Sequence, residues 1–169
     1  CAVLLLAVPA LAAPNHIAAE LVAETTGMPG ETITLAIAMR PEEGWHGYWQ
    51  NPGDAGLGMT LKWSVPYGTR PGEMRYPVPT TLLVAGLMNH VYKGDYAVLV
   101  PLGLPVDGKP GTVLPIAVEA QWLACTDQVC VPERARLQTS VVLGPRGAPD
   151  LRFDAWRARL PAPLGAEAR

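Results

Sequence analysis

Apolar and polar residues alternate along several short stretches in the first 143 positions of the chain. The alternation is clearest over residues 33–39, where the larger apolar side chains fall on one face, and it is looser over residues 17–24 and 61–65. A period of two residues is typical of β-strands that bury one face. The same kind of pattern predicts further strands at residues 44–49, 96–104, 113–123 and 136–143.

Clusters of turn-forming residues separate these stretches, at residues 27–30, 66–68 and 107–111. Glycine and proline mark turns because glycine tolerates positive φ and proline fixes φ and lacks an N–H donor. Seven or more short strands joined by turns predict an all-β fold, namely an immunoglobulin-like antiparallel β-sandwich. A closed barrel is the main alternative.

The composition fits one exported domain. The 169 residues are 49% hydrophobic, which is enough for one proper core, and the 18 Pro and 17 Gly favour strands and turns over a helical bundle. The formal net charge of -2 lacks the basic excess that is expected of a nucleic-acid-binding protein.

The first twelve residues predict part of a secretory signal peptide. They form an apolar run that closes on Ala10-x-Ala12, a small-residue pattern typical of a cleavage site, and the run is too short to span a membrane. A buried N-terminal strand or helix is the alternative. Cleavage after Ala12 would discard Cys1 and leave a sandwich domain over residues 13–143.

Residues 144–169 are interpreted as a linker or tail that leads to a missing downstream domain. The segment Gly144 to Pro149 has linker composition, and Phe153, Trp156 and Leu160 predict one apolar stripe on a short helix.

Cys125 and Cys130 are the two cysteines that remain after export, and an oxidising compartment permits a disulfide between them. Four intervening residues form a connection tight enough for pairing. A ring this small constrains the unfolded chain by only roughly 2 kcal/mol, so a redox role and a structural role both stay open. Asp127 lies between the cysteines and opposes thiolate formation, which favours an electron carrier with a dedicated partner over an aggressive oxidant.

Two segments together resemble a known family. They are WLACTDQVCVPE at residues 122–133 and GWHGYWQNPGDAG at residues 44–56. Over roughly His16 to Leu143 the chain resembles the N-terminal periplasmic domain of the DsbD thiol:disulfide interchange proteins, especially the ScsB-like branch linked to copper tolerance. The spacing differs, because the well-known DsbD pattern has five residues between its cysteines and this chain has four.

The resemblance implies a periplasmic electron-relay domain of a protein-disulfide reductase. Such a domain precedes a membrane electron-transfer domain and a thioredoxin-like domain, and it reduces thioredoxin-fold partners, including disulfide isomerases and proteins of cytochrome c maturation. By position, Cys130 corresponds to the cysteine that forms mixed disulfides and Cys125 to the resolving cysteine. The redox-active disulfide serves without a cofactor, and no metal site is predicted.

The family also has a cap loop that shields the cysteines, and it corresponds here to approximately residues 83–90. Leu87, Met88 and His90 in this region are candidates for capping or partner binding. Trp45, Tyr48 and Trp49 are further candidates, because flat apolar rings beside the disulfide would dock a partner. Aromatic residues on a strand are also common in cores, and a single histidine is often only structural.

Two other functions compete with the relay. One is a non-catalytic sandwich that binds proteins and carries a structural disulfide. The other is a copper-binding module that uses Cys125 and Cys130 with a nearby histidine or methionine, since thiolate and thioether sulfurs are soft ligands for Cu(I). Two cysteines without a second pair of ligands do not make a tetrahedral zinc site.

Overall fold

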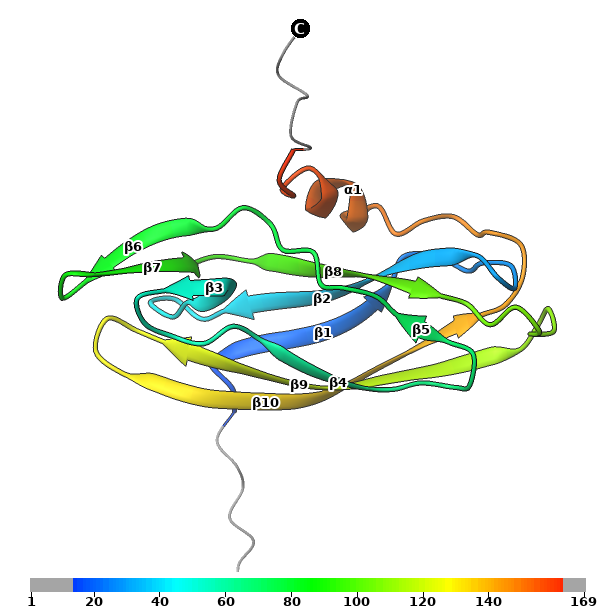
Figure 1. Ribbon diagram of the computed structural model, residues 1–169, viewed down its shortest axis with the longest axis horizontal. Coiled ribbons are helices and arrows are strands. Elements are labelled where there is room, and N and C mark those ends of the chain that lie inside the picture. Colours follow the sequence, from blue (N-terminus) through cyan, green and yellow to red (C-terminus); the bar gives the residue numbers. More distant parts are fainter. Residues whose placement is uncertain (1–13, 163–169) are drawn as a thin grey trace, which may run out of the picture.

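Strands dominate residues 14–162, the part of the chain that the computed structural model describes (Figure 1). The predicted signal peptide and the last residues of the predicted tail lie outside this part. Three antiparallel sheets are formed, in the strand orders β1-β2-β8-β5, β10-β9-β4 and β3-β7-β6. The predicted immunoglobulin-like, all-β fold is confirmed, and the described strands form open sheets rather than a closed barrel.

The first sheet contains the alternating stretches near the N-terminus together with a later strand. Its members are β1 (Ile17–Ala23), β2 (Thr32–Pro41), β8 (Tyr96–Gly103) and the two-residue β5 (Arg70–Pro71). The second sheet contains β4 (Thr60–Ser64), β9 (Val113–Cys125) and β10 (Cys130–Val142). The third contains β3 (Gly47–Gly53), β6 (Thr80–Val84) and β7 (Leu87–Tyr92).

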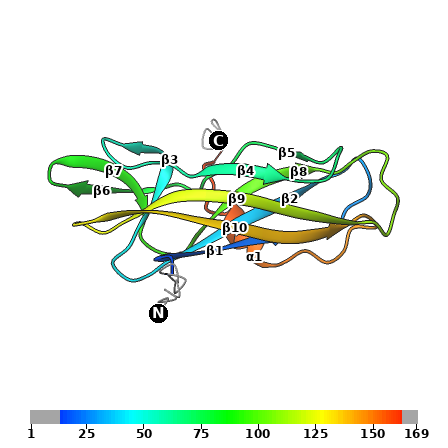
Figure 2. The ribbon, with the colours of Figure 1, turned by 90° about the horizontal axis from the view of Figure 1, so that it is seen from below.

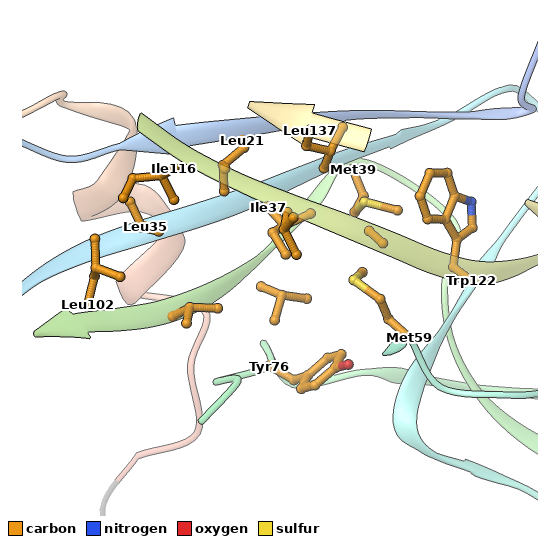
Figure 3. Packing of buried hydrophobic residues seen from close by; sticks show 14 of the residues in the cluster. Leu21, Leu35, Ile37, Met39, Met59, Tyr76, Leu102, Ile116, Trp122 and Leu137 are labelled. Atoms are coloured by element: carbon orange, nitrogen blue, oxygen red, sulfur yellow. The ribbon is translucent and has the colours of Figure 1, made fainter. Parts of the chain in front are cut away.

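The main core lies between the first and second sheets. Figure 3 shows Leu35 of β2 close to Ile116 of β9, and the same cluster contains Ile37 of β2, Trp122 of β9 and Leu102 of β8. Their period-two spacing places these side chains on the inner face of each strand, where removal of apolar surface from water stabilises the fold. The core therefore fixes β9, the strand that ends at Cys125.

A second, smaller core lies on the outer face of the first sheet. The short helix α1 (Arg152–Arg157) covers this face, and the side chain of Phe153 is fully buried against Ala36 and Leu99. Trp156 and Leu160 pack against the same cluster, which confirms the predicted apolar stripe, but α1 ends at Arg157 and Leu160 follows the helix. This part of the predicted tail is thus folded onto the sandwich. Within residues 14–162, no helix is long and apolar enough to cross a membrane.

The structure extends or shifts three predicted elements. The aromatic strand expected at residues 44–49 is β3, at Gly47–Gly53, and the last strand begins at Cys130 instead of residue 136. The segment expected to be a cap loop, residues 83–90, is part of a β-hairpin made by β6 and β7. Its turn, Ala85-Gly86, has positive φ at both residues, a geometry that suits the right-handed twist of hairpin strands.

Candidate functional site

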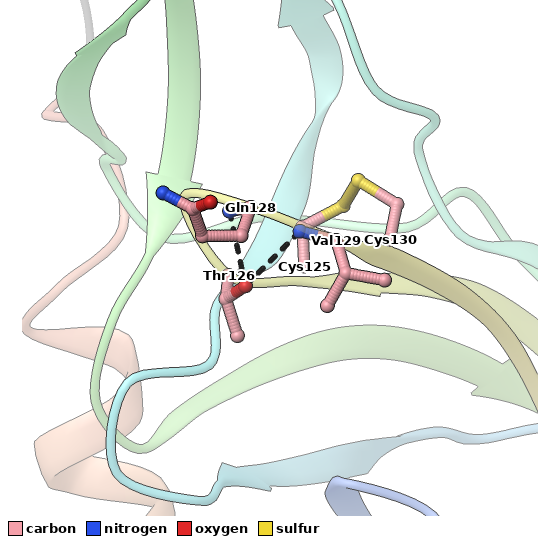
Figure 4. Close-up of a disulfide and its surroundings, with 5 residues drawn as sticks. All are labelled: Cys125, Thr126, Gln128, Val129 and Cys130. Carbon is pink, nitrogen blue, oxygen red and sulfur yellow. Dashed lines mark hydrogen bonds between the residues drawn. A yellow bond between two sulfur atoms is a disulfide. The ribbon is translucent and has the colours of Figure 1, made fainter.

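The candidate site lies at the turn between the two longest strands, β9 and β10. Their antiparallel register runs from Val113 opposite Val142 to Cys125 opposite Cys130. The turn is closed by the Thr126 N–H, which donates to the Val129 carbonyl at 2.8 Å. The Thr126 hydroxyl oxygen also accepts from the N–H groups of Gln128 and Val129, both at 3.1 Å (Figure 4). These bonds hold the turn in a defined shape.

Cys125 and Cys130 form a disulfide as the last facing pair of the hairpin, with their Cα atoms 4.1 Å apart (Figure 4). Their surroundings differ sharply. Cys125 is only 1% exposed, whereas Cys130 is an exposed residue. An attacking thiolate must approach a disulfide sulfur along the S–S axis, so the side open to a partner is that of Cys130.

Cys125 is held on its other side by His46. The His46 N–H donates to the Cys125 carbonyl at 2.8 Å, and the Cys125 N–H donates to the His46 carbonyl at 3.1 Å. The Cys125 side chain joins an apolar cluster with Tyr48 and Val91. The buried half of the disulfide therefore has a fixed backbone and a packed environment.

Burial and neighbouring charges shape the electrostatics around the site. Desolvation lowers the pKa of His46, while the Asp127 carboxylate in the turn acts to raise it and the Lys93 ammonium acts to lower it. Burial also raises the pKa of Tyr48, whose ring meets that of His46 edge-on at 5.4 Å. At neutral pH, His46 is thus mainly an uncharged imidazole and Tyr48 an uncharged phenol.

The aromatic candidates divide into two groups. Tyr48 packs with Cys125, as described above. Trp45 instead stacks on His16 with ring centroids 3.7 Å apart, and Trp49 meets His90 edge-on at 5.5 Å. Both tryptophans pack against the main core. The structure therefore brings one of the three aromatic residues into the apolar cluster that contains a cysteine.

The candidates on the β6–β7 hairpin form an exposed apolar tip. Leu87 and Met88 are about half exposed, at 46% and 49%, and Leu83 is 70% exposed. Figures 1 and 2 both place the turn of this hairpin at the same end of the molecule as the β9–β10 turn. The hairpin is anchored by Asp54, whose carboxylate accepts from the Met88 N–H at 2.8 Å. His90 bonds through Nδ1 to the Asn51 carbonyl at 3.0 Å.

Two buried polar residues near these hairpins escaped the sequence-based predictions. Glu133 on β10 is 6% exposed, and Asn89 on β7 is 3% exposed. Glu133 lies in the quoted cysteine segment, but nothing in the sequence pattern distinguishes a buried carboxylate from a solvated one on an alternating strand. Within residues 14–162, no group of three or more His, Cys, Asp or Glu residues is arranged to hold a metal ion.

The fold and the site together define an immunoglobulin-like sandwich with a disulfide at the tip of its longest hairpin. The family model described as the N-terminal domain of the thiol:disulfide interchange protein DsbD matches residues 15–141. The chain belongs to this family and is a thiol:disulfide interchange domain.

A solved structure has the same fold. The N-terminal periplasmic domain of ScsB from Proteus mirabilis matches with a TM-score of 0.64 and 19% identity, over 93% of this chain and 58% of that chain. This chain therefore spans little more than half the length of that structure. The reduced N-terminal domain of DsbD from Neisseria meningitidis matches with a TM-score of 0.42 and 14% identity, over 77% of this chain and 90% of that chain. No curated protein sequence matches significantly.

Proposed function

We propose that this domain carries electrons to disulfides of partner proteins through the Cys125/Cys130 pair. The observation that carries the proposal is the contrast between a buried Cys125 and an exposed Cys130 in one disulfide at a hairpin tip. A structural bridge needs no such contrast. An exchange site does, because one sulfur must be accessible to the partner while the other stays close enough to resolve the mixed disulfide.

The chemistry balances as a two-electron transfer. In the reduced domain, the Cys130 thiolate attacks a partner disulfide, a Cys130–partner disulfide forms, and the partner's second sulfur leaves and takes up a proton. Cys125 then loses its proton and attacks the Cys130 sulfur, which releases the partner as a dithiol. The domain ends as the Cys125–Cys130 disulfide, and an upstream dithiol must reduce it again.

Family membership supports thioredoxin-fold partners and a periplasmic location. The exposed apolar side chains Leu83, Leu87 and Met88 offer such a partner a contact surface at the same end of the molecule as the disulfide. Attachment to a membrane electron-transfer domain, a role in cytochrome c maturation and a link to copper tolerance are parts of the same proposal. Stoichiometric Cu(I) uptake by the reduced domain is the test of the copper link.

Trapping experiments test the roles of the two sulfurs. A Cys125→Ser variant keeps the exposed thiol but lacks the resolving one, so it should accumulate a covalent complex with an oxidised thioredoxin-fold protein. A Cys130→Ser variant should form no complex. If this variant reduces the partner at the wild-type rate, the proposal is refuted. Non-reducing gels and intact mass measure both results.

The midpoint potential of the couple separates a relay from a structural bridge. A carrier that is both reduced and reoxidised needs a value between those of thioredoxin and the strong periplasmic oxidants, roughly -270 to -120 mV. A value below about -300 mV belongs to a structural disulfide and would favour the non-catalytic binding sandwich. Equilibration in glutathione or dithiothreitol buffers, followed by alkylation and mass measurement, gives the value.

A further inference from the structure

His46 is the direct cross-strand neighbour of Cys125 on the side opposite Cys130. The two residues exchange both backbone hydrogen bonds, which defines a hydrogen-bonded antiparallel pair. Side chains of such a pair project from the same face of the sheet, with Cβ atoms about 5 Å apart. Cys125 and Cys130 are likewise a facing pair. His46, Cys125 and Cys130 therefore form one row across three adjacent segments.

The position of Tyr48 supports the same arrangement. Tyr48 lies two residues after His46, so both side chains point to the same face of an extended segment. The Tyr48 side chain packs with Cys125, and its ring meets the His46 ring edge-on. His46 itself is 3% exposed. The imidazole is thus enclosed on the face that carries the Cys125 sulfur.

We propose that His46 accepts the proton of the Cys125 thiol when Cys125 resolves the mixed disulfide on Cys130. This inference rests on the proposed function and adds a proton acceptor to it. Resolution requires a thiolate at a buried position, and burial disfavours the charged form. A neutral imidazole beside the thiol removes that obstacle by taking the proton as the sulfur attacks.

The charged and titratable groups around His46 suit this role. The Asp127 carboxylate comes from the β9–β10 turn, the Lys93 ammonium from the turn after β7, and the Tyr48 phenol from β3. Burial keeps the pKa of His46 below its ordinary value, so at neutral pH the ring is uncharged and has a nitrogen that can accept a proton. Once the ring is protonated, Asp127 stabilises the imidazolium.

The step is balanced in atoms and charge. The Cys125 S–H bond breaks and the proton passes to an imidazole nitrogen of His46. The Cys125 sulfur forms a bond to the Cys130 sulfur, and the bond from Cys130 to the partner breaks. The partner sulfur leaves as a thiolate, and His46 returns its proton to that thiolate or to water.

A two-step reaction with dithiobis-nitrobenzoate isolates the resolving step. The reduced domain releases one coloured thiolate when Cys130 attacks, and a second when Cys125 displaces the group left on Cys130. Nitrothiobenzoate leaves without protonation, so the second step depends only on the Cys125 proton. In the wild type, we expect the rate of the second step to level off above the pH at which His46 loses its charge. In His46→Gln, it should fall at least about tenfold at pH 7 and rise in proportion to hydroxide.

Two further variants sharpen the test. His16→Gln is the matched control, because His16 stacks on Trp45 and pairs with Glu42, and it should behave as the wild type in both steps. Asp127→Asn alters only an exposed turn residue and should move the levelling-off to lower pH, since the carboxylate no longer raises the pKa of His46.

The outcomes distinguish this inference from the proposed function. A normal first step with an unchanged second step and pH profile in His46→Gln would overturn the role of His46 alone. The role of His46 would also be overturned if the rate of the second step in Asp127→Asn levels off at the same pH as in the wild type. If the wild-type domain releases no first thiolate, Cys130 is unreactive and the proposed function itself fails.

Discussion

The buried carboxylate of Glu133 gives a sharp test of what holds the site hairpin in place. It accepts hydrogen bonds from the backbone N–H groups of His16 and Ile17 and from the indole Nε1–H of Trp122. Trp122 lies directly opposite Glu133 in the β9–β10 register. One side chain therefore joins the start of β1 to both strands of the hairpin, three residues from the disulfide in each strand.

Removing this carboxylate leaves two fully buried donors without a partner. The bonds from Ile17 N–H, at 3.1 Å, and from Trp122 Nε1–H, at 2.8 Å, both lie in buried surroundings. An orphaned buried donor costs about 1–3 kcal/mol, so Glu133→Ala should lower the free energy of unfolding by about 4 kcal/mol. Domains of this kind are stable by about 5–15 kcal/mol in total, so the loss is a large fraction.

Urea unfolding of the oxidised domain, followed by tryptophan fluorescence, measures this loss. Glu119→Ala is the matched control on the same hairpin, because the Glu119 side chain is 54% exposed and pairs with Arg136 at 3.6 Å in solvent. An exposed pair of this kind contributes less than about 1 kcal/mol. If Glu133→Ala and Glu119→Ala prove equally stable, the argument from buried donors is wrong.

Three further outcomes are expected. Reduction of Cys125–Cys130 should lower the free energy of unfolding by only about 2 kcal/mol, because the ring holds six residues, and urea curves with and without dithiothreitol check this. Phe153→Ala should cost about 3 kcal/mol in the same assay, because the side chain is fully buried. The Arg157 guanidinium holds the pKa of Glu24 below its ordinary value, so their pairing stabilises the domain above about pH 4.5 and is lost as the pH falls further. In Arg157→Gln, the melting temperature should therefore depend less on pH in this acid range.

The sequence predicted the sandwich well where strands bury one face. The stretches at residues 33–39, 96–104 and 113–123 are strands in the structure because their inward side chains fill the core between two sheets. The hairpin of β6 and β7 was missed. Its apolar residues Leu83, Leu87 and Met88 are exposed, so they follow no inward-facing period, and Ala85-Gly86 is a weak turn signal.

The site was predictable in part for the same physical reason. The spacing of Cys125 and Cys130 made pairing easy to foresee because the contact is local. The contacts that distinguish the two sulfurs are long-range. His46 meets Cys125 only through the approach of two sheets, and Glu133 bonds to Ile17 from 116 positions away. A pattern of apolar and polar residues within a short stretch of sequence does not indicate such long-range contacts.

The proposed exchange at the disulfide can run in both directions, because the same exposed sulfur is attacked in each. When an upstream thiolate attacks the exposed Cys130 sulfur, the S–S bond breaks and Cys125 leaves into its buried position as a thiolate. In the proposed mechanism, that sulfur then takes a proton from His46, which has first received it from the attacking thiol or from water. Microscopic reversibility requires the group that takes the proton during resolution to return it during reduction. In this proposal, the exposed Cys130 sulfur reacts with the partners, and His46 and the buried Cys125 exchange the proton.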